Sequence, residues 1–481
     1  MIFNSFEFLL FLPIVFVLFW FAKKHLTIQN WLLVAASYFF YGWWDWKFLA
    51  LIIISSTLDY CLGLAIDSAT SKRKQKWLLG VSIAANLGIL GFFKYFNFFI
   101  DSFITAFSSV GIEMNEWSLN IILPVGISFY TFQTLSYTID VYRKKIRPTK
   151  DVAAFFAFVS FFPQLVAGPI ERATNLLPQF QKTKSFNYAQ AVDGARQALW
   201  GFFKKIVIAD NCAYYANEVF ANSADASSIY LVFGALMFTF QIYCDFSGYS
   251  DIAIGISKFF GFNLKRNFAF PYFSRDIAEF WRRWHISLST WFRDYLYIPL
   301  GGSKGSKLFV IRNVFIIFVV SGFWHGANWT FVAWGFLNAL YFIPVLLLNR
   351  NRSNLDVVAK NKLLPSFKEF FQMTTTFLLV VLAWIFFRAD SISHAGDYLI
   401  SIFSFQAGSY KFMAFDLYKG ILVSGLVVLM LFFEWVFRER EFGLEIAHKS
   451  ALFRRIVYAI VILLIAFFGR FAKEEFIYFQ F

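Results

Sequence analysis

Long apolar runs constrain the fold of this chain more than any other feature of its sequence. The runs of spanning or near-spanning length lie near 6–22, 31–45, 48–66, 77–100, 119–140, 229–258, 308–324, 328–348, 370–388, 417–437 and 451–469. A helix needs about 20 mostly apolar residues to cross a bilayer, and these runs do not alternate as the strands of a membrane barrel do. We therefore expect an all-α polytopic integral membrane protein with about eleven transmembrane helices.

The composition also indicates a membrane environment. Of the 481 residues, 59% are hydrophobic and only 15% are charged, which is well below the charged share of an ordinary soluble domain. The formal net charge of +14 is carried by short basic clusters between the apolar runs. This pattern is typical of loops that face anionic lipid, so we expect the lipid bilayer as a partner and no nucleic acid.

The basic loops also predict the orientation of the chain. Lys23 and Lys24 follow the first run, and basic clusters within 72–76 and 143–150 follow the third and fifth runs. The segment 101–118 contains no lysine or arginine. Because basic loops favour the cytoplasmic side, we expect a protein of the cytoplasmic (inner) membrane with an extracytoplasmic N-terminus.

The sequence shows no internal repeat and no separate soluble domain, so we expect one membrane domain over residues 1–481. Within it we expect N-terminal spans over 1–150, a catalytic core over 151–350 and C-terminal spans over 351–481. The core should contain re-entrant and interfacial helices, because two of its apolar pieces are interrupted.

The two interrupted pieces predict different structures. The segment 152–170 contains Pro163, Gly168 and Pro169, which predicts a broken or re-entrant segment that is buried in protein or lines a cavity. The segment 194–209 carries Lys204 and Lys205 in its middle, which predicts an interfacial helix.

The region 262–313 is too polar to span a membrane, with nine basic and three acidic residues, yet it is rich in aromatic residues. We expect a cytoplasm-side structure pressed against or into the bilayer. Asp276 followed by Glu279 predicts the start of a helix. At helical spacing, His285 lies in an aromatic face, and the arginines fall elsewhere, free to meet headgroups or a charged ligand. The face contains Trp281, Trp284, His285, Leu288 and Phe292, and the arginines are Arg282, Arg283 and Arg293. The alternative is an interfacial histidine with a satisfied hydrogen bond.

A second histidine, His325, follows the short run 308–324 within SGFWHGANW. Seventeen residues of helix rise only about 25 Å, so we expect His325 at the end of a short hairpin that turns at Gly326, within membrane depth or close to the far face. The side-chain amide of Asn328 could orient the imidazole of His325 or donate a hydrogen bond to an oxyanion. An imidazole in such a place can take a proton from a hydroxyl that attacks an acyl thioester. The alternative is a histidine that packs between two helices.

Other chemistries are less well supported. The chain has no GxSxG elbow and no HExxH motif, the segment GGSKGSK at 301–307 lacks Walker spacing, and two histidines forty residues apart are weak support for a metal. We therefore favour acid–base chemistry and expect no metal. Asp245 and Asp251 lie inside an apolar run, where carboxylates either line a polar path or hydrogen-bond broken backbone around Gly248.

Several blocks resemble the membrane-bound O-acyltransferase superfamily, and specifically its bacterial alginate O-acetyltransferase branch. The blocks are LPVGISFYTFQTLSYTIDVYR at 123–143, FFPQLVAGPIER at 161–172, QIYCDFSGYSDIAIG at 241–255, FWRRWHISLSTWFRDYLYIPLGG at 280–302 and SGFWHGANWTFVAWG at 321–335. With the N-terminal NSFEFLLFLP, the resemblance runs over most of the chain.

The resemblance implies helices that enclose a central tunnel and two signature histidines, His325 (the catalytic one) and His285. It also implies acetyl transfer from cytoplasmic acetyl-CoA, a co-substrate and not a bound cofactor, to an extracytoplasmic partner of the SGNH-hydrolase type that acetylates an exported polysaccharide. His325 would act as a general base or carry the acetyl group briefly. Arg282, Arg283 and Arg293 would receive the phosphates of coenzyme A. The further candidate contacts are Trp281, Trp284, Trp324, Asn328 and Asp245.

Two alternatives remain. One is the D-alanyl relay of teichoic acid synthesis in the same superfamily, in which a carrier protein's phosphopantetheine brings the acyl group; the RRWHISLSTW block favours the alginate branch. The other is a transporter or flippase with Asp245, Asp251 and the segment 152–170 along its substrate path. The sequence does not identify the polysaccharide.

Overall fold

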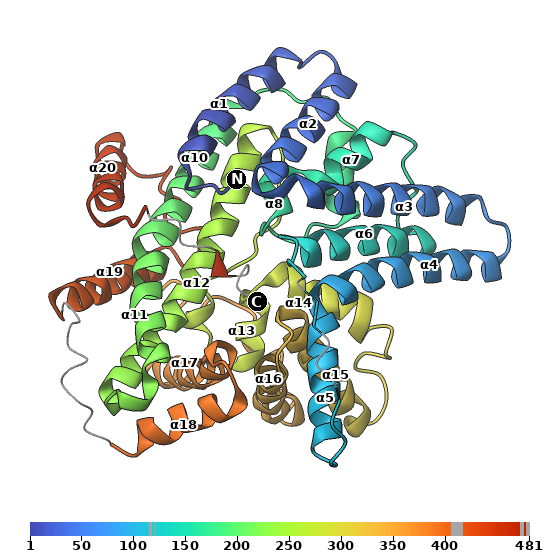
Figure 1. Cartoon of the computed structure of the whole chain (residues 1–481). Coiled ribbons are helices and arrows are strands. Elements are labelled where there is room, and N and C mark those ends of the chain that lie inside the picture. The colour runs from blue at the N-terminus through green and yellow to red at the C-terminus, as the bar shows by residue number, and fades with distance from the viewer. Residues whose placement is uncertain (115–117, 120, 406–416, 472–475, 478–481) are drawn as a thin grey trace. The chain divides into compact units, whose positions relative to one another are not determined.

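The computed structural model describes residues 1–481 apart from 115–117, 120, 406–416, 472–475 and 478–481 (Figure 1). The described residues form helices and loops and contain no β-strand. Eight of their helical segments are long and apolar enough to cross a membrane: Leu26–Ser68, Lys72–Ser108, Ser228–Phe259, Lys307–His325, Trp329–Leu347, Phe367–Arg388, Tyr418–Val436 and Ala451–Phe468. The expectation of an all-α, multi-pass membrane protein is therefore confirmed.

The count of eleven spans and the tunnel stay predictions. The runs near 31–45 and 48–66 join in one 43-residue helical segment. The runs near 6–22 and 119–140 form α1 (Phe6–Phe21) and α6 (Ile127–Tyr142), which have only 16 residues each.

Contacts divide the chain into two compact units. Unit 1 contains Met1–Ala191 and Ile256–Leu264, and unit 2 contains Val192–Gly255 and Lys265–Phe481. The expected boundaries at 150 and 350 stay a prediction. The change from unit 1 to unit 2 falls inside α10 (Tyr188–Phe202).

Unit 1 is built around α6. The further helices of this unit are α1, α2 (Leu26–Asp45), η1 (Trp46–Phe48), α3 (Leu49–Ser68), α4 (Lys72–Leu90), η2 (Gly91–Tyr95), α5 (Phe96–Ser108), α7 (Val152–Ser160), α8 (Phe162–Leu165) and α9 (Ala173–Phe180). Helices α3, α4 and α6 lie side by side (Figure 1). They enclose Asp59, whose carboxylate accepts hydrogen bonds from Ser82 Oγ at 2.6 Å and Asn86 Nδ2 at 2.8 Å. These bonds compensate a carboxylate that is fully buried.

The prediction of a broken segment over 152–170 is confirmed. Helix α7 ends at Ser160, and the four-residue α8 begins at Phe162. Phe162 N–H donates to Ser37 Oγ at 3.0 Å, and Gln164 Nε2 donates to Gln133 Oε1 at 2.8 Å. The break is buried in protein, and these bonds satisfy polar groups that would be costly in lipid.

Unit 2 contains most of α10 and α12 (Ser228–Phe259) and the rest of the chain. Its other helices are η3 (Phe203–Ala209), α11 (Asp210–Ala221), η4 (Ser223–Asp225), η5 (Pro271–Phe273), α13 (Ile277–Arg283), α14 (Ile286–Phe292), η6 (Arg293–Tyr297), α15 (Lys307–His325), α16 (Trp329–Leu347), α17 (Phe367–Arg388), α18 (Ile392–Phe403), α19 (Leu417–Val436) and α20 (Ala451–Phe468).

The prediction of an interfacial helix over 194–209 is wrong. Helix α10 continues through the π-helical turn η3, and Lys204 and Lys205 are only 3% and 5% exposed. Lys204 Nζ lies 2.7 Å from Asp251, and Lys205 Nζ lies 2.7 Å from both Asp245 and Asp210. The lysines therefore neutralise buried carboxylates within the protein and do not reach toward lipid headgroups.

Several aromatic residues of 262–313 pack inside the protein. Phe268, Tyr272, Phe280 and Trp284 are buried inside unit 2 and pack against one another. Packing within the protein therefore explains why these rings are present, and the position of the region relative to the bilayer stays a prediction.

Candidate functional site

His325 lies where two closely packed helices, α15 and α16, form a hairpin. Helix α15 begins after Ser306, whose side chain accepts from Phe309 N–H, and it ends at His325. The chain then passes Gly326 into α16, as the run lengths predict. Glycine permits the close approach of the two helices: a Cβ atom on Gly322 would lie 2.2 Å from the carbonyl oxygen of Phe331.

His325 is 4% exposed and is surrounded by aromatic rings. Its ring centroid lies 5.2 Å from that of Trp334 on α16 and 5.4 Å from that of Phe387 on α17, both in edge-on arrangements. The ring of Trp324 lies 5.0 Å away. Such walls keep water away from the imidazole and strengthen electrostatic interactions within the site.

His285 lies in a second aromatic environment and is 1% exposed. Its ring meets Phe246 of α12 edge-on at 4.5 Å and lies parallel to Phe268 at 6.3 Å. Burial lowers the pKa of His285 from 6.5 to about 3. His285 is therefore neutral at physiological pH.

The two histidines, forty residues apart in sequence, lie next to each other in unit 2. Their ring centroids are 6.4 Å apart, and both rings lie near Trp324. The fold therefore joins two imidazoles that the sequence alone does not connect.

The expected continuous helix through His285 is wrong. The N-cap is confirmed, because the Asp276 side chain accepts from Glu279 N–H at 2.7 Å. Helix α13 nevertheless ends at Arg283, Trp284 is extended, and His285 has φ 42° and ψ 55° before α14 begins at Ile286. A left-handed conformation is uncommon for a residue other than glycine.

The tryptophans singled out from the sequence belong to one aromatic cluster around the histidines. Trp281 lies 5.7 Å from Trp334, and Trp284 lies 5.0 Å from Trp384. Trp334 and Trp384 stack on each other at 5.5 Å. The sequence does not single out the other rings around the histidines, although Phe246 and Trp334 lie inside blocks that carry the family resemblance; these rings are Phe246, Phe268, Trp334, Trp384 and Phe387.

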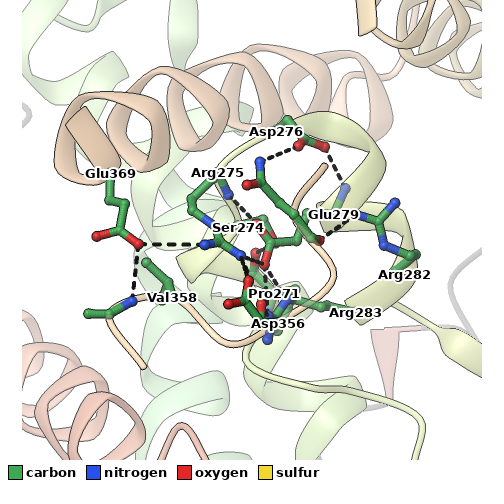
Figure 2. Close-up of polar contacts among 12 residues, drawn as sticks. Pro271, Ser274, Arg275, Asp276, Glu279, Arg282, Arg283, Asp356, Val358 and Glu369 are labelled. Carbon is green, nitrogen blue, oxygen red and sulfur yellow. Dashed lines mark hydrogen bonds and ion pairs between the residues drawn. The ribbon is translucent and has the colours of Figure 1, made fainter. Parts of the chain in front are cut away.

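The arginines of α13 bind neighbouring protein groups (Figure 2). Arg282 donates to the carbonyl oxygens of Asn351 and Asn354, both at 2.7 Å. Arg283 forms an ion pair with Glu279 at 2.7 Å and donates to the carbonyl oxygen of Asp356 at 3.0 Å. These bonds hold the loop between α16 and α17 against α13.

A further arginine, Arg275, strengthens the same attachment. Its guanidinium group contacts Glu279 at 3.0 Å and Asp356 at 3.1 Å (Figure 2). Burial lowers the pKa of Arg275, but the hydrogen bonds and charges of Glu279 and Asp356 together outweigh it and raise the pKa above its usual value. The loop thus remains attached to α13 by more than one arginine.

The remaining predicted site residues make other contacts. Arg293 is exposed and forms an ion pair with Asp294 at 2.7 Å. The Asn328 side chain accepts from Thr330 N–H and donates to the carbonyl oxygen of Asp390, both at 3.0 Å, so its amide caps α16. Asp245, besides its pairing with Lys205, accepts from Ile477 N–H at 2.7 Å.

Comparison with known proteins gives a family and several relatives. The model of the membrane-bound O-acyltransferase family matches residues 38–358. The chain is 40% identical to the probable alginate O-acetylase AlgI of Pseudomonas syringae pv. tomato, over 89% of this chain and 80% of that protein. It is 38% identical to the peptidoglycan O-acetyltransferase of Helicobacter pylori, over 80% and 76% of the two chains. It is 29% identical to the teichoic acid D-alanyltransferase of Bacillus subtilis, over only 46% and 58%.

Proposed function

The chain belongs to the membrane-bound O-acyltransferase family and is an O-acyltransferase, and we propose that it passes an acetyl group through the membrane for O-acetylation of an exported polysaccharide. The donor is cytoplasmic acetyl-CoA, and the acceptor is an extracytoplasmic partner of the SGNH-hydrolase type. The protein lies in the inner membrane with its N-terminus outside, and a central tunnel connects the two sides.

The observation that carries this proposal is the pair of neighbouring, buried imidazoles, with ring centroids 6.4 Å apart. His325 acts as the general base. It accepts the proton of the acceptor hydroxyl as the oxygen attacks the thioester carbonyl carbon. The new C–O bond forms, the C–S bond breaks, and the leaving thiolate takes the proton from His325. The second imidazole, His285, is neutral because burial lowers its pKa. A neutral imidazole carries one N–H, which can donate to the developing oxyanion.

The relatives support acetyl transfer over the D-alanyl relay. The O-acetylating relatives align with 80% or more of this chain, whereas the D-alanyltransferase aligns with 46%. The names of the O-acetylating relatives include both alginate and peptidoglycan. The acceptor polymer is therefore proposed only as a cell-surface polysaccharide.

The donor's phosphates need cations at the cytoplasmic side. Arg293 is exposed, and its one ion-pair partner among the described residues is Asp294, so it can bind a phosphate by releasing that carboxylate alone. Arg282 and Arg283 would first have to release the loop carbonyl groups that they bind. Arg293 is therefore the first candidate of the three.

The proposal is tested by complementing a gene deletion with wild-type protein, His325→Ala or His448→Ala. His448 is exposed, lies outside the site and provides a matched loss of one imidazole. Ester-linked acetate released from surface polysaccharide by mild alkali should be restored by wild type and by His448→Ala but not by His325→Ala. Full restoration by His325→Ala, at equal protein levels, would refute the proposal.

A further inference from the structure

The conformation of His285 requires support from its surroundings. Its φ of 42° and ψ of 55° place it in the left-handed region, between two helices of seven residues each. The histidine is also almost completely buried. Such backbone conformations persist only when neighbouring structure fixes them, and they are frequent at functional sites.

Asn267 makes the hydrogen bonds that fix the chain directly after His285. Its carbonyl oxygen accepts from Ile286 N–H at 2.9 Å. Its side-chain Oδ1 accepts from Ser287 N–H at 3.2 Å and from Ser287 Oγ at 2.8 Å. Asn267 is itself 1% exposed, so these bonds form away from water, where they are strong.

The same segment holds the chain before His285 and the wall beside it. Ala269 N–H donates to the carbonyl oxygen of Arg283 at 2.9 Å. Asn267 Nδ2 donates to Ser250 Oγ at 3.2 Å, and Ser250 lies one helical turn after Phe246, whose ring meets His285 at 4.5 Å. Asn267 therefore links the backbone at His285 to the helix that forms its aromatic wall.

We propose that Asn267 is the positioning residue for His285, and that its side-chain amide holds the imidazole beside His325. The meaning of this role for catalysis rests on the proposed acetyl transfer. Asparagine suits the position because one side chain must accept two hydrogen bonds and donate a third. Alanine provides neither group, and a serine side chain is too short to reach both Ser287 and Ser250.

The test compares Asn267→Ala with Asn313→Ala in the purified full-length protein. Asn313 is also fully buried; its Nδ2 donates to the carbonyl groups of Leu300 and Gly302, and its Oδ1 accepts from Arg312, so within the described residues these side-chain bonds join it to none of the segments that flank His285. Asn267→Ala should lower kcat for acetyl transfer about 10- to 100-fold, with the KM for acetyl-CoA unchanged within about twofold, because a misplaced group affects the reacting geometry. Asn313→Ala should change kcat much less.

A second measurement does not depend on activity. Diethyl pyrocarbonate modifies accessible, neutral imidazoles, and mass spectrometry assigns the modified residue. Modification of His285 should be faster in Asn267→Ala than in wild type, whereas modification of His325 should change little. Unchanged reactivity of His285, or equal effects of the two asparagine variants on kcat, would overturn the proposal.

Two further outcomes keep the inference separate from the proposed function. If Asn267→Ala does not accumulate, the test uses Ser250→Ala, which removes only the acceptor of the Asn267 Nδ2 hydrogen bond. This variant should raise the reactivity of His285 toward diethyl pyrocarbonate, but less than Asn267→Ala would. No rise in reactivity would overturn the proposal. If wild-type protein transfers no acetyl group but Asn267→Ala still exposes His285, the proposed function fails and the positioning role stands.

Discussion

The two histidines of the site are held in place in different ways. His325 is the last residue of a regular 19-residue helix, and its location follows from a hairpin of two spanning segments. His285 lies in a left-handed break between two short helices, and the backbone N–H groups of the next two residues donate hydrogen bonds to Asn267, which fixes the conformation. Local sequence therefore determines the first position, whereas tertiary contacts determine the second. The second should be the more sensitive to changes in residues that do not touch the reactants.

The largest expected effect is the loss of kcat when the two histidines are replaced, and it shows whether both imidazoles act at one reaction centre. His325→Ala should lower kcat by about 10³-fold and His285→Ala by about 10²-fold, since a general base and one oxyanion donor contribute in these ranges. The double variant should be no slower than His325→Ala alone, because groups that act together are not additive. Steady-state acetyl transfer measures all three, and multiplicative losses would indicate separate steps.

The same contrast shows what can be predicted from the sequence. The hairpin at Gly326 follows from the lengths of two apolar runs, and the break near Phe161 follows from neighbouring proline and glycine. The segment 277–292 contains neither glycine nor proline, so helical periodicity wrongly continues through His285. The break depends on the bonds to Asn267, which periodicity does not reveal. The partners of Lys204 and Lys205 were missed for the same reason, because ion pairing is a tertiary property.

The hairpin that supports His325 can be tested by crowding it. In Gly322→Ala the new Cβ would meet the Phe331 backbone at 2.2 Å, whereas a Cβ on Gly425 of α19 would meet no described atom within 4 Å outside its own helix backbone and its chain neighbours. Overpacking should lower stability by about 1–3 kcal/mol in Gly322→Ala, and Gly425→Ala should remain close to wild type. Melting temperatures in detergent measure both stabilities. Equal melting temperatures for the two variants would show that α15 and α16 can move apart without loss of stability, which would contradict the prediction.

The buried state of His285 should appear in the pH dependence of stability. Because burial lowers its pKa from 6.5 to about 3, the unfolded chain binds a proton below pH 6.5 that the folded chain does not. Stability should therefore fall as the pH decreases from 6.5 toward 3. Between pH 6.5 and 5 wild type should lose about 2 kcal/mol more than His285→Gln in denaturant unfolding. Identical pH dependence of the two proteins would contradict a neutral, buried imidazole.

The smallest effect concerns the arginines of α13. Arg282→Ala removes two bonds to loop carbonyl groups, while Arg275 and Arg283 still hold the loop, so stability should fall by about 1 kcal/mol. The KM for acetyl-CoA should stay unchanged. Arg293→Ala should show the reverse, a raised KM with unchanged stability. A raised KM in Arg282→Ala alone would instead assign the phosphates of the donor to Arg282.

The most direct test of the account measures acetyl transfer by purified protein in lipid vesicles supplied with labelled acetyl-CoA and the extracytoplasmic partner. Wild type should release coenzyme A thiol and label the partner, and His325→Ala should do neither above background while remaining folded. Labelling by His325→Ala at the wild-type rate would contradict the central claim that this imidazole, at the end of the hairpin, carries out the transfer.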